Sequence, residues 1–238
     1  MQVCLIAPRS MLEWTTLGDM HFIVPLTADE AFYAKEEKYK IIDNGVYETG
    51  RPMSLEDFIQ LALRVRADEI IIPDVMFNWE ATYENAYTAF EEFKDKVLPF
   101  KTMIVPQAKH PAQWVDAYAQ MTRSFPEAHS IGVPKWLDGR FHCRAAMMHY
   151  LAKTGKLDER PHHFLGVDNL ADLSNLPSWA IRSCDTSKPF TYAYSGKALG
   201  RWTTQELKRV DLEGPRINPA FHDILRQNIH TLLEIAHT

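Results

Sequence analysis

Residues 54–77, SLEDFIQLALRVRADEIIIPDVMF, contain a helix pattern followed directly by a strand pattern. Ser54 is a typical helix N-cap with Asp57 three residues later, and apolar side chains then recur at helical spacing. The apolar run at 69–73 is stopped by a turn signal at Asp74, which predicts a buried strand. A helix that leads into a buried strand is typical of an α/β fold with a parallel sheet.

The same alternation recurs along the whole chain. Short apolar, β-branched runs are separated by helical stretches, and each run ends in a turn signal or a polar residue. The eight runs lie at residues 3–7, 21–25, 40–43, 69–73, 102–106, 130–133, 163–167 and 180–184, with further helices expected at 79–96, 111–125, 140–156 and 219–237. This pattern predicts a compact (β/α)8 barrel, one domain over residues 1–238 with an additional C-terminal helix. The competing fold is an open doubly wound sheet, but no run is followed by a GxGxxG or P-loop turn.

The composition of the 238 residues indicates a globular protein, since 46% are hydrophobic and 24% are charged. No apolar run approaches the ~18 residues that cross a bilayer, and the first residues lack a signal-peptide pattern. We therefore expect a cytoplasmic protein with no membrane partner. The cysteines, Cys4, Cys143 and Cys184, are too scattered for a disulfide framework or a CxxC-type zinc site.

Charge is distributed unevenly between the two parts of the chain. Residues 1–100 carry 9 basic and 18 acidic side chains, and residues 101–238 carry 17 basic and 13 acidic side chains, so the net charges are −9 and +4. A polyanionic partner would therefore contact the second part. Scattered, solvated lysines and arginines are an equally simple reading of the charge alone.

The carboxyl ends of parallel barrel strands form one face, and that face holds the active site. The polar residues and glycine that end the runs, with the valine beside the glycine, are Asp43, Asp74, Gln107, Gly132, Val133 and Asp185. Aspartate also caps helices and forms turns, so any one of the three aspartates alone is as readily structural. Three carboxylates around one pocket suit glycosidic chemistry, in which one attacks the anomeric carbon and another moves the proton. They also suit a divalent metal ion.

Hydrogen-bond geometry points to a purine-like ligand. A carboxylate such as Asp74 can accept the two parallel donors of a guanine edge, and an amide such as Gln107 can donate to its O6. Tyr47 lies four residues beyond Asp43 and could stack on such a base.

Residues 43–48, DNGVYE, resemble the DSGG(F/Y)Q motif of the guanine transglycosylases, barrel enzymes that exchange a guanine in RNA or DNA for a 7-deazaguanine. Further pieces follow in the family's order on successive strands: Asp74, Gln107, SIGV at 130–133, HFLGV at 163–167, and Asp185. The resemblance spans roughly residues 40 to 190, and the shared order of short motifs carries it.

The resemblance implies a role for each matching position. Asp185 matches the aspartate nucleophile that attacks the ribose C1′, and Asp43 matches the general acid/base. The base-recognition set is matched by Asp74, Gln107, Gly132 and Val133, with Tyr47 and Leu165 on the two faces of the base. No cofactor is implied, because the covalent intermediate conserves the energy of the broken glycosidic bond.

The chain departs from the tRNA-acting members, which generally carry a CxCxxC…H zinc site beyond the eighth strand. No cysteine follows Cys184, so zinc is not expected. A short, zinc-free member is most similar to the 7-deazaguanine DNA transglycosylases of phages and bacteria. The expected partners are therefore DNA and a free 7-deazaguanine base, in the host cytoplasm if a phage encodes the protein. Exchange on tRNA is the alternative, and a homodimer is left open.

Phosphate contacts are expected on the loops after strands six to eight. The candidates are Lys135, Arg140, Arg144, Lys188, Lys197 and Arg201. Two further functions stay open. One is a catalytically silent nucleic-acid-binding subunit of the same fold, although such a subunit need not keep both Asp43 and Asp185. The weaker one is a metal-dependent barrel hydrolase that uses the same aspartates.

Overall fold

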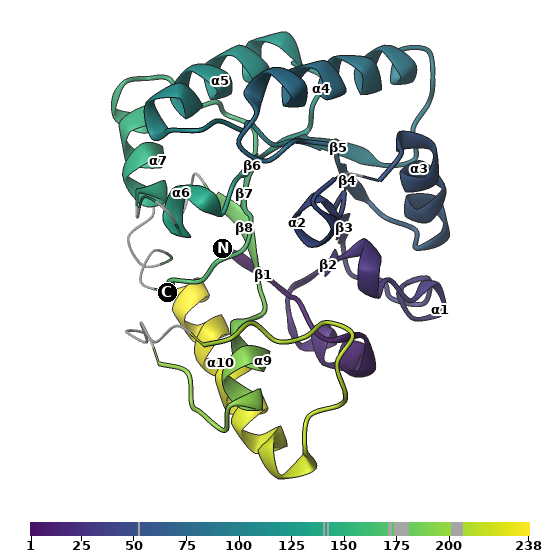
Figure 1. Ribbon diagram of the computed structural model, residues 1–238, viewed down its shortest axis with the longest axis vertical. Helices are drawn as coiled ribbons and strands as arrows, with labels where there is room; N and C mark the ends of the chain where they lie inside the picture. Colours follow the sequence, from purple (N-terminus) through teal and green to yellow (C-terminus); the bar gives the residue numbers. More distant parts are fainter. Residues whose placement is uncertain (52, 140, 142, 171–172, 174–180, 201–206) are drawn as a thin grey trace.

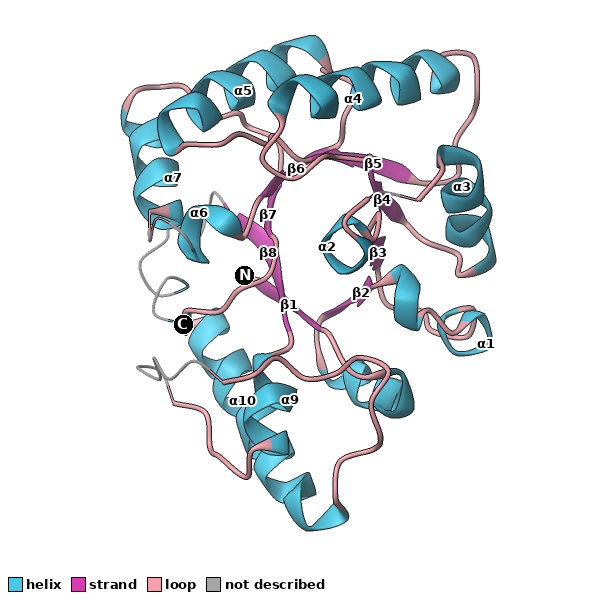
Figure 2. Ribbon diagram, in the orientation of Figure 1, coloured by secondary structure: helices cyan, strands magenta, loops and turns pink. Residues whose placement is uncertain are grey.

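The computed structural model describes residues 1–51, 53–139, 141, 143–170, 173, 181–200 and 207–238. Its strands are β1 (Gln2–Leu5), β2 (Met20–Ile23), β3 (Lys40–Ile42), β4 (Glu69–Ile71), β5 (Lys101–Ile104), β6 (Ser130–Val133), β7 (His162–Phe164) and β8 (Ile181–Thr186). Each strand pairs in parallel with the next, and β8 returns to β1 with Asp185 opposite Cys4, so the barrel is closed. The predicted (β/α)8 barrel is therefore confirmed, and Figure 2 shows its strands as a ring surrounded by helices.

Helices of the described residues follow the strands around the ring (Figure 1). The α-helices are α1 (Glu30–Tyr33), α2 (Val46–Thr49), α3 (Leu55–Arg64), α4 (Trp79–Phe93), α5 (Pro111–Ser124), α6 (Trp136–Gly139), α7 (Arg144–Lys153), α9 (Lys188–Tyr194) and α10 (His222–His237). Short 3-10 helices lie at Arg9–Leu17, Pro25–Thr27 and Pro219–Phe221. None of the helices in the described ranges combines the length and hydrophobicity that a bilayer crossing requires.

Helix α3 shows how the sequence specifies these elements. Ser54 caps it by accepting a hydrogen bond from the Asp57 backbone N–H at 3.2 Å, as predicted from the sequence. Its apolar face buries Phe58, Leu61 and Ala62 against the barrel. The chain then enters β4, whose residues are all buried, as expected for a barrel strand covered by helices.

The last strand extends beyond its predicted range. The apolar run predicted at 180–184 continues through Asp185 and Thr186, because both residues keep ladder pairing with β1. Residue 180 lies outside the described residues. Asp185 is therefore part of the strand and does not follow it, which fixes its backbone between two neighbouring strands.

The predicted C-terminal helix is present as α10, which packs along α9 (Figure 1). Asn228 is fully buried between them, where its Oδ1 accepts from the Leu199 N–H at 2.6 Å and its Nδ2 donates to the Pro189 carbonyl at 3.2 Å. These buried hydrogen bonds fix α10 against the segment that follows β8.

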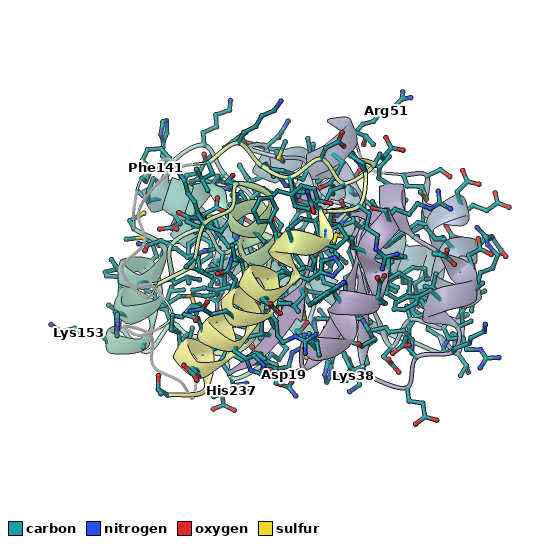
Figure 3. All side chains as sticks on the ribbon, turned by 90° about the horizontal axis from the view of Figure 1, so that it is seen from below. Asp19, Lys38, Arg51, Phe141, Lys153 and His237 are labelled. Carbon is teal, nitrogen blue, oxygen red and sulfur yellow. The ribbon has the colours of Figure 1, made fainter. Side chains whose placement is uncertain are left out.

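Figure 3 shows the two ends of the barrel in side view. Arg51 and Phe141 lie at the end where the strands finish, and Asp19, Lys38 and His237 lie at the opposite end. At the latter end His237 Nε2 lies 2.9 Å from Asp19 Oδ2. The carboxyl-terminal end carries the pocket described next.

Candidate active site

A pocket of about 320 Å³ opens at the carboxyl ends of the strands. This volume lies at the lower end of the ~300–1,000 Å³ typical of small-molecule sites. All eight strands, or the loops directly after them, contribute to the lining: Ile6, Phe22, Asp43, Asp74, Gln107, Pro134, Leu165 and Asp185. The position is the usual one for the active site of a (β/α)8 barrel.

The structure brings most of the predicted substrate positions to this pocket. The predicted residues in its lining are Asp43, Tyr47, Asp74, Gln107, Leu165 and Asp185. Gly132 and Val133 are not in the lining. A Cβ at Gly132 would lie 2.7 Å from Cγ2 of Val105, the residue after β5, so close packing at this point favours glycine. Val133 is fully buried in the core.

Asp185 is 2% exposed and reaches the pocket from the end of β8. Its Oδ1 lies 3.1 Å from His163 Nε2 and accepts a hydrogen bond from the Gly166 backbone N–H at 3.0 Å. Among the described residues, no hydrogen bond reaches Oδ2. One oxygen of this carboxylate is therefore held by the protein, and the other is available to a ligand.

Gly166 contacts Asp185 through a backbone in the left-handed conformation. Its φ is +59°, a conformation that favours glycine. A Cβ here would also lie 2.7 Å from Lys135 Cδ. Glycine at this position lets the N–H point at the carboxylate while the Lys135 side chain packs across the loop.

Asp43 follows β3 directly and is half-buried in the pocket wall. Loss of water raises its pKa well above the usual range, and the nearby carboxyl groups of Glu48, Asp74 and Asp185 raise it further. A carboxyl group that keeps its proton at higher pH can act as a general acid. Asp43 and Asp185 thus line one pocket in different surroundings.

A buried network surrounds Asp74, which is 3% exposed. Its Oδ1 accepts from Asn44 Nδ2 at 2.6 Å, and its Oδ2 accepts from Gln107 Nε2 at 2.5 Å. Trp136 Nε1 donates to Gln107 Oε1 at 2.9 Å, so the amide nitrogen of Gln107 must face Asp74. Burial raises the pKa of Asp74 to about 6, although both amide donors oppose the shift.

The pocket rim carries an aromatic ring with two cations close to it. Tyr47 is 47% exposed on α2. The Arg209 guanidinium lies 4.7 Å and the Lys135 ammonium 5.4 Å from its ring centroid. Arg209 Nη2 also lies 3.2 Å from Glu48 Oε1, and Lys135 Nζ lies 2.6 Å from Asp168 Oδ2. Burial raises the pKa of Glu48 while Arg209 opposes that rise.

A strained aromatic residue forms another part of the wall. Phe77 lines the pocket with φ of +62°, which is costly for a residue with a Cβ, by ~1–2 kcal/mol. Its ring lies 5.8 Å from that of Trp136, and its N–H donates to Gln107 Oε1 at 3.4 Å. Such strain persists where surrounding contacts enforce it, commonly at functional sites.

No protein-family model matches the chain, and no curated protein matches it in sequence. The assignment of the site therefore depends on its geometry and on the order of motifs along the strands.

The predicted phosphate contacts divide into three groups. Lys135 lies at the pocket rim, and Lys188 and Lys197 are half-exposed on and after α9. Arg140 and Arg201 lie outside the described residues. The prediction for Arg144 is wrong, because its side chain is fully buried, with Nη1 donating to the Leu165 carbonyl at 2.7 Å.

Sequence reasoning missed several residues of this site. Asn44, Trp136 and Arg209 join the network and the rim, and His163 contacts the predicted nucleophile. Asn44 carried a usable signal, because it lies beside Asp43 at a strand end. In the described parts of the chain, no group of three or more His, Cys, Asp or Glu is placed to hold a metal ion.

Proposed function

We propose that this protein is a transglycosylase that exchanges guanine in DNA for a 7-deazaguanine base through a covalent intermediate on Asp185. The observation that carries the proposal is the pairing of Asp43 and Asp185 on one pocket. Asp185 offers a free carboxylate oxygen, and Asp43 has a raised pKa. Those are the properties that a glycosidic nucleophile and its general acid require.

The two carboxyl groups divide the reaction between them. Asp185 Oδ2 attacks C1′ of the target nucleotide, and the C1′–N9 bond breaks with its electron pair moving to the base. Asp43 gives its proton to the departing guanine. The incoming 7-deazaguanine then loses its N9 proton to Asp43 and attacks C1′, which releases Asp185. No cofactor enters, because one glycosidic bond replaces another.

Base recognition is assigned to the buried network. Each oxygen of Asp74 accepts a hydrogen bond from one amide side chain, and a further lone pair could accept from the N1–H and N2–H edge of a guanine-type base. The second N–H of the Gln107 amide is then available to O6. Tyr47 and Leu165, which both line the pocket, would cover the two faces of the base.

The variant Asp74→Ala is expected to weaken binding of 7-cyano-7-deazaguanine by about 1.5–3 kcal/mol, the contribution of a charged hydrogen-bonded partner. Calorimetry with the free base measures this directly. Because ionised Asp74 accepts the donors, the wild-type affinity should also fall as pH drops through about 6.

Asp95→Ala provides the matched control, since Asp95 is exposed on the loop after α4. It should bind the base as the wild type does at every pH. Unchanged affinity in Asp74→Ala would remove Asp74 from base recognition.

The target guanine must leave the helix stack to reach this pocket, and the flanking phosphates then need cationic partners. Lys135 and Arg209 lie at the pocket rim, and both are close to the ring of Tyr47. The choice of DNA over tRNA comes from the resemblance to the zinc-free branch of the transglycosylases.

Binding to duplex DNA should weaken steeply with salt, with a slope of about −0.9 per neutralised phosphate. Lys135→Gln should make this slope shallower by about one phosphate, measured by fluorescence anisotropy from low to moderate salt. The control is Lys94→Gln, in the acidic part of the chain at residues 1–100. Lys94 Nζ lies 3.9 Å from Glu91 Oε1, and its replacement should leave the salt slope unchanged. An affinity independent of salt would contradict the basic surface.

One experiment tests the function as a whole. The protein is incubated with duplex DNA, single-stranded DNA or a tRNA transcript together with candidate 7-deazaguanines, and the digested nucleosides are analysed by mass. Exchange is expected on DNA and not on tRNA at equal concentration. Exchange on tRNA alone would overturn the choice of DNA, and binding without exchange would indicate a silent subunit.

A further inference from the structure

A chain of polar side chains, buried except for the partly exposed Arg182, runs through the barrel to Asp185. It begins at Glu69, the first residue of β4, which is fully buried and whose Oε2 lies 2.9 Å from Arg182 Nη1. Arg182 Nε donates to Ser183 Oγ at 3.2 Å, and Ser183 Oγ lies 2.8 Å from His163 Nδ1. His163 Nε2 then lies 3.1 Å from Asp185 Oδ1.

The direction of these hydrogen bonds follows from the donors available. A guanidinium group only donates, so Ser183 Oγ accepts from Arg182 and its own hydrogen is free to point at His163 Nδ1. The nucleophilic carboxylate of Asp185 only accepts, so the ring nitrogen that faces it, Nε2, carries the hydrogen of that contact. His163 therefore donates to Asp185 Oδ1.

The His163 ring is held rigidly in this orientation. It is fully buried and stacks on Phe22 with centroids 5.4 Å apart and an interplanar angle of 3°. Phe22 lines the pocket, so this stack separates the imidazole from the ligand space. The imidazole therefore contacts Asp185 but has no direct access to substrate.

We infer that His163 is a positioning residue for the nucleophile, an inference that rests on the proposed function. The torsion that turns a carboxylate is soft, so the two oxygens of Asp185 would otherwise exchange places readily. Donors from His163 and Gly166 both hold Oδ1, which keeps Oδ2 directed at the pocket. Misplacing a reacting group by about 1 Å can reduce a rate by ~100-fold.

A test compares variants that remove or retain the donor. His163→Leu fills the core without a donor, and His163→Gln can place an amide N–H near the position of Nε2. We expect His163→Leu to form the covalent Asp185 adduct with DNA ~100-fold more slowly in single turnover, with unchanged affinity for the free base. His163→Gln should recover most of the rate.

The matched control is His230→Leu, the same change at an exposed position of α10, which should behave as the wild type. Wild-type adduct formation by folded His163→Leu would overturn the inference. It would also be overturned if His163→Gln were folded and as slow as His163→Leu, because packing alone would then explain the defect.

A second measurement is independent of activity. Nitrogen-15 NMR of the histidine side chains should show a protonated Nε2 for His163 in the wild type, and a changed ring signal in Ser183→Ala, which removes the hydroxyl partner of Nδ1. An unprotonated Nε2 in the wild type would overturn the inference. If the wild type shows the expected ring form but no base exchange on any polynucleotide, the proposed function fails on its own.

Discussion

The variant Asp185→Asn is expected to lose base exchange by at least ~1,000-fold, which corresponds to ~4 kcal/mol of transition-state stabilisation. The amide can still accept the hydrogen bonds from His163 and Gly166 on its oxygen, but it lacks the nucleophilic carboxylate. Two measurements report the loss: the rate of nucleoside exchange, and the amount of protein–DNA adduct that survives denaturation. Both should disappear together.

Asp95→Asn makes the same chemical change on an exposed loop and should keep full activity. Thermal melting and binding of the free base by Asp185→Asn check that its barrel is intact. Near-normal exchange by a folded Asp185→Asn protein would remove this residue from the nucleophilic role.

The variant Asp43→Asn is expected to slow exchange by ~100- to 10,000-fold, the usual contribution of a general acid or base. The departing guanine needs the protonated form of Asp43, whose pKa is raised by burial and by neighbouring carboxyl groups. The wild-type rate of adduct formation should therefore decline as pH rises through that pKa, and Asp43→Asn should lack this alkaline decline. The loss of affinity for the base below about pH 6, which we assign to Asp74, should persist in the variant.

The pH dependence of the free energy of unfolding provides an independent test of the raised pKa of Asp43. Its pKa is higher in the folded protein than in the unfolded chain, so the folded state binds this proton more tightly. The free energy of unfolding must then fall as pH rises from the unfolded pKa toward the folded one. Asp43→Asn should lose that part of the pH dependence, measured by chemical denaturation. An alkaline decline of activity that remains in the variant would assign it to another group.

The barrel could be predicted from the sequence because each buried strand has its own apolar run and turn signal. Once those runs are placed, parallel topology alone brings Asp43, Asp74, Gln107 and Asp185 to one end. The pocket lining contains all four. Their placement follows from strand order, which is a property that short local patterns can specify.

The burial of individual side chains and the contacts between neighbouring strands could not be predicted in the same way. Arg144 was predicted from charge, yet charge does not show whether a side chain points inward at the start of α7. His163 contacts Asp185 across β7 and β8, whose register shifts between His162 and His163. An irregular register changes which side chains meet, and nothing in the local sequence signals it. Arg209 reaches Glu48 from a distant loop.

Closure of the barrel by β1 and β8 has a consequence for the order of assembly. β8 carries Asp185 and is held between β7 and β1, the first strand to leave the ribosome among the eight. Pairing of the first and last strands is the contact of greatest sequence separation in the sheet, so it carries a large loop-closure entropy. A chain synthesised only as far as β7 already contains Asp43, Asp74 and Gln107, but it lacks Asp185, the proposed nucleophile. On the proposed function, we therefore expect covalent reactivity toward a polynucleotide only after the ring of strands is complete.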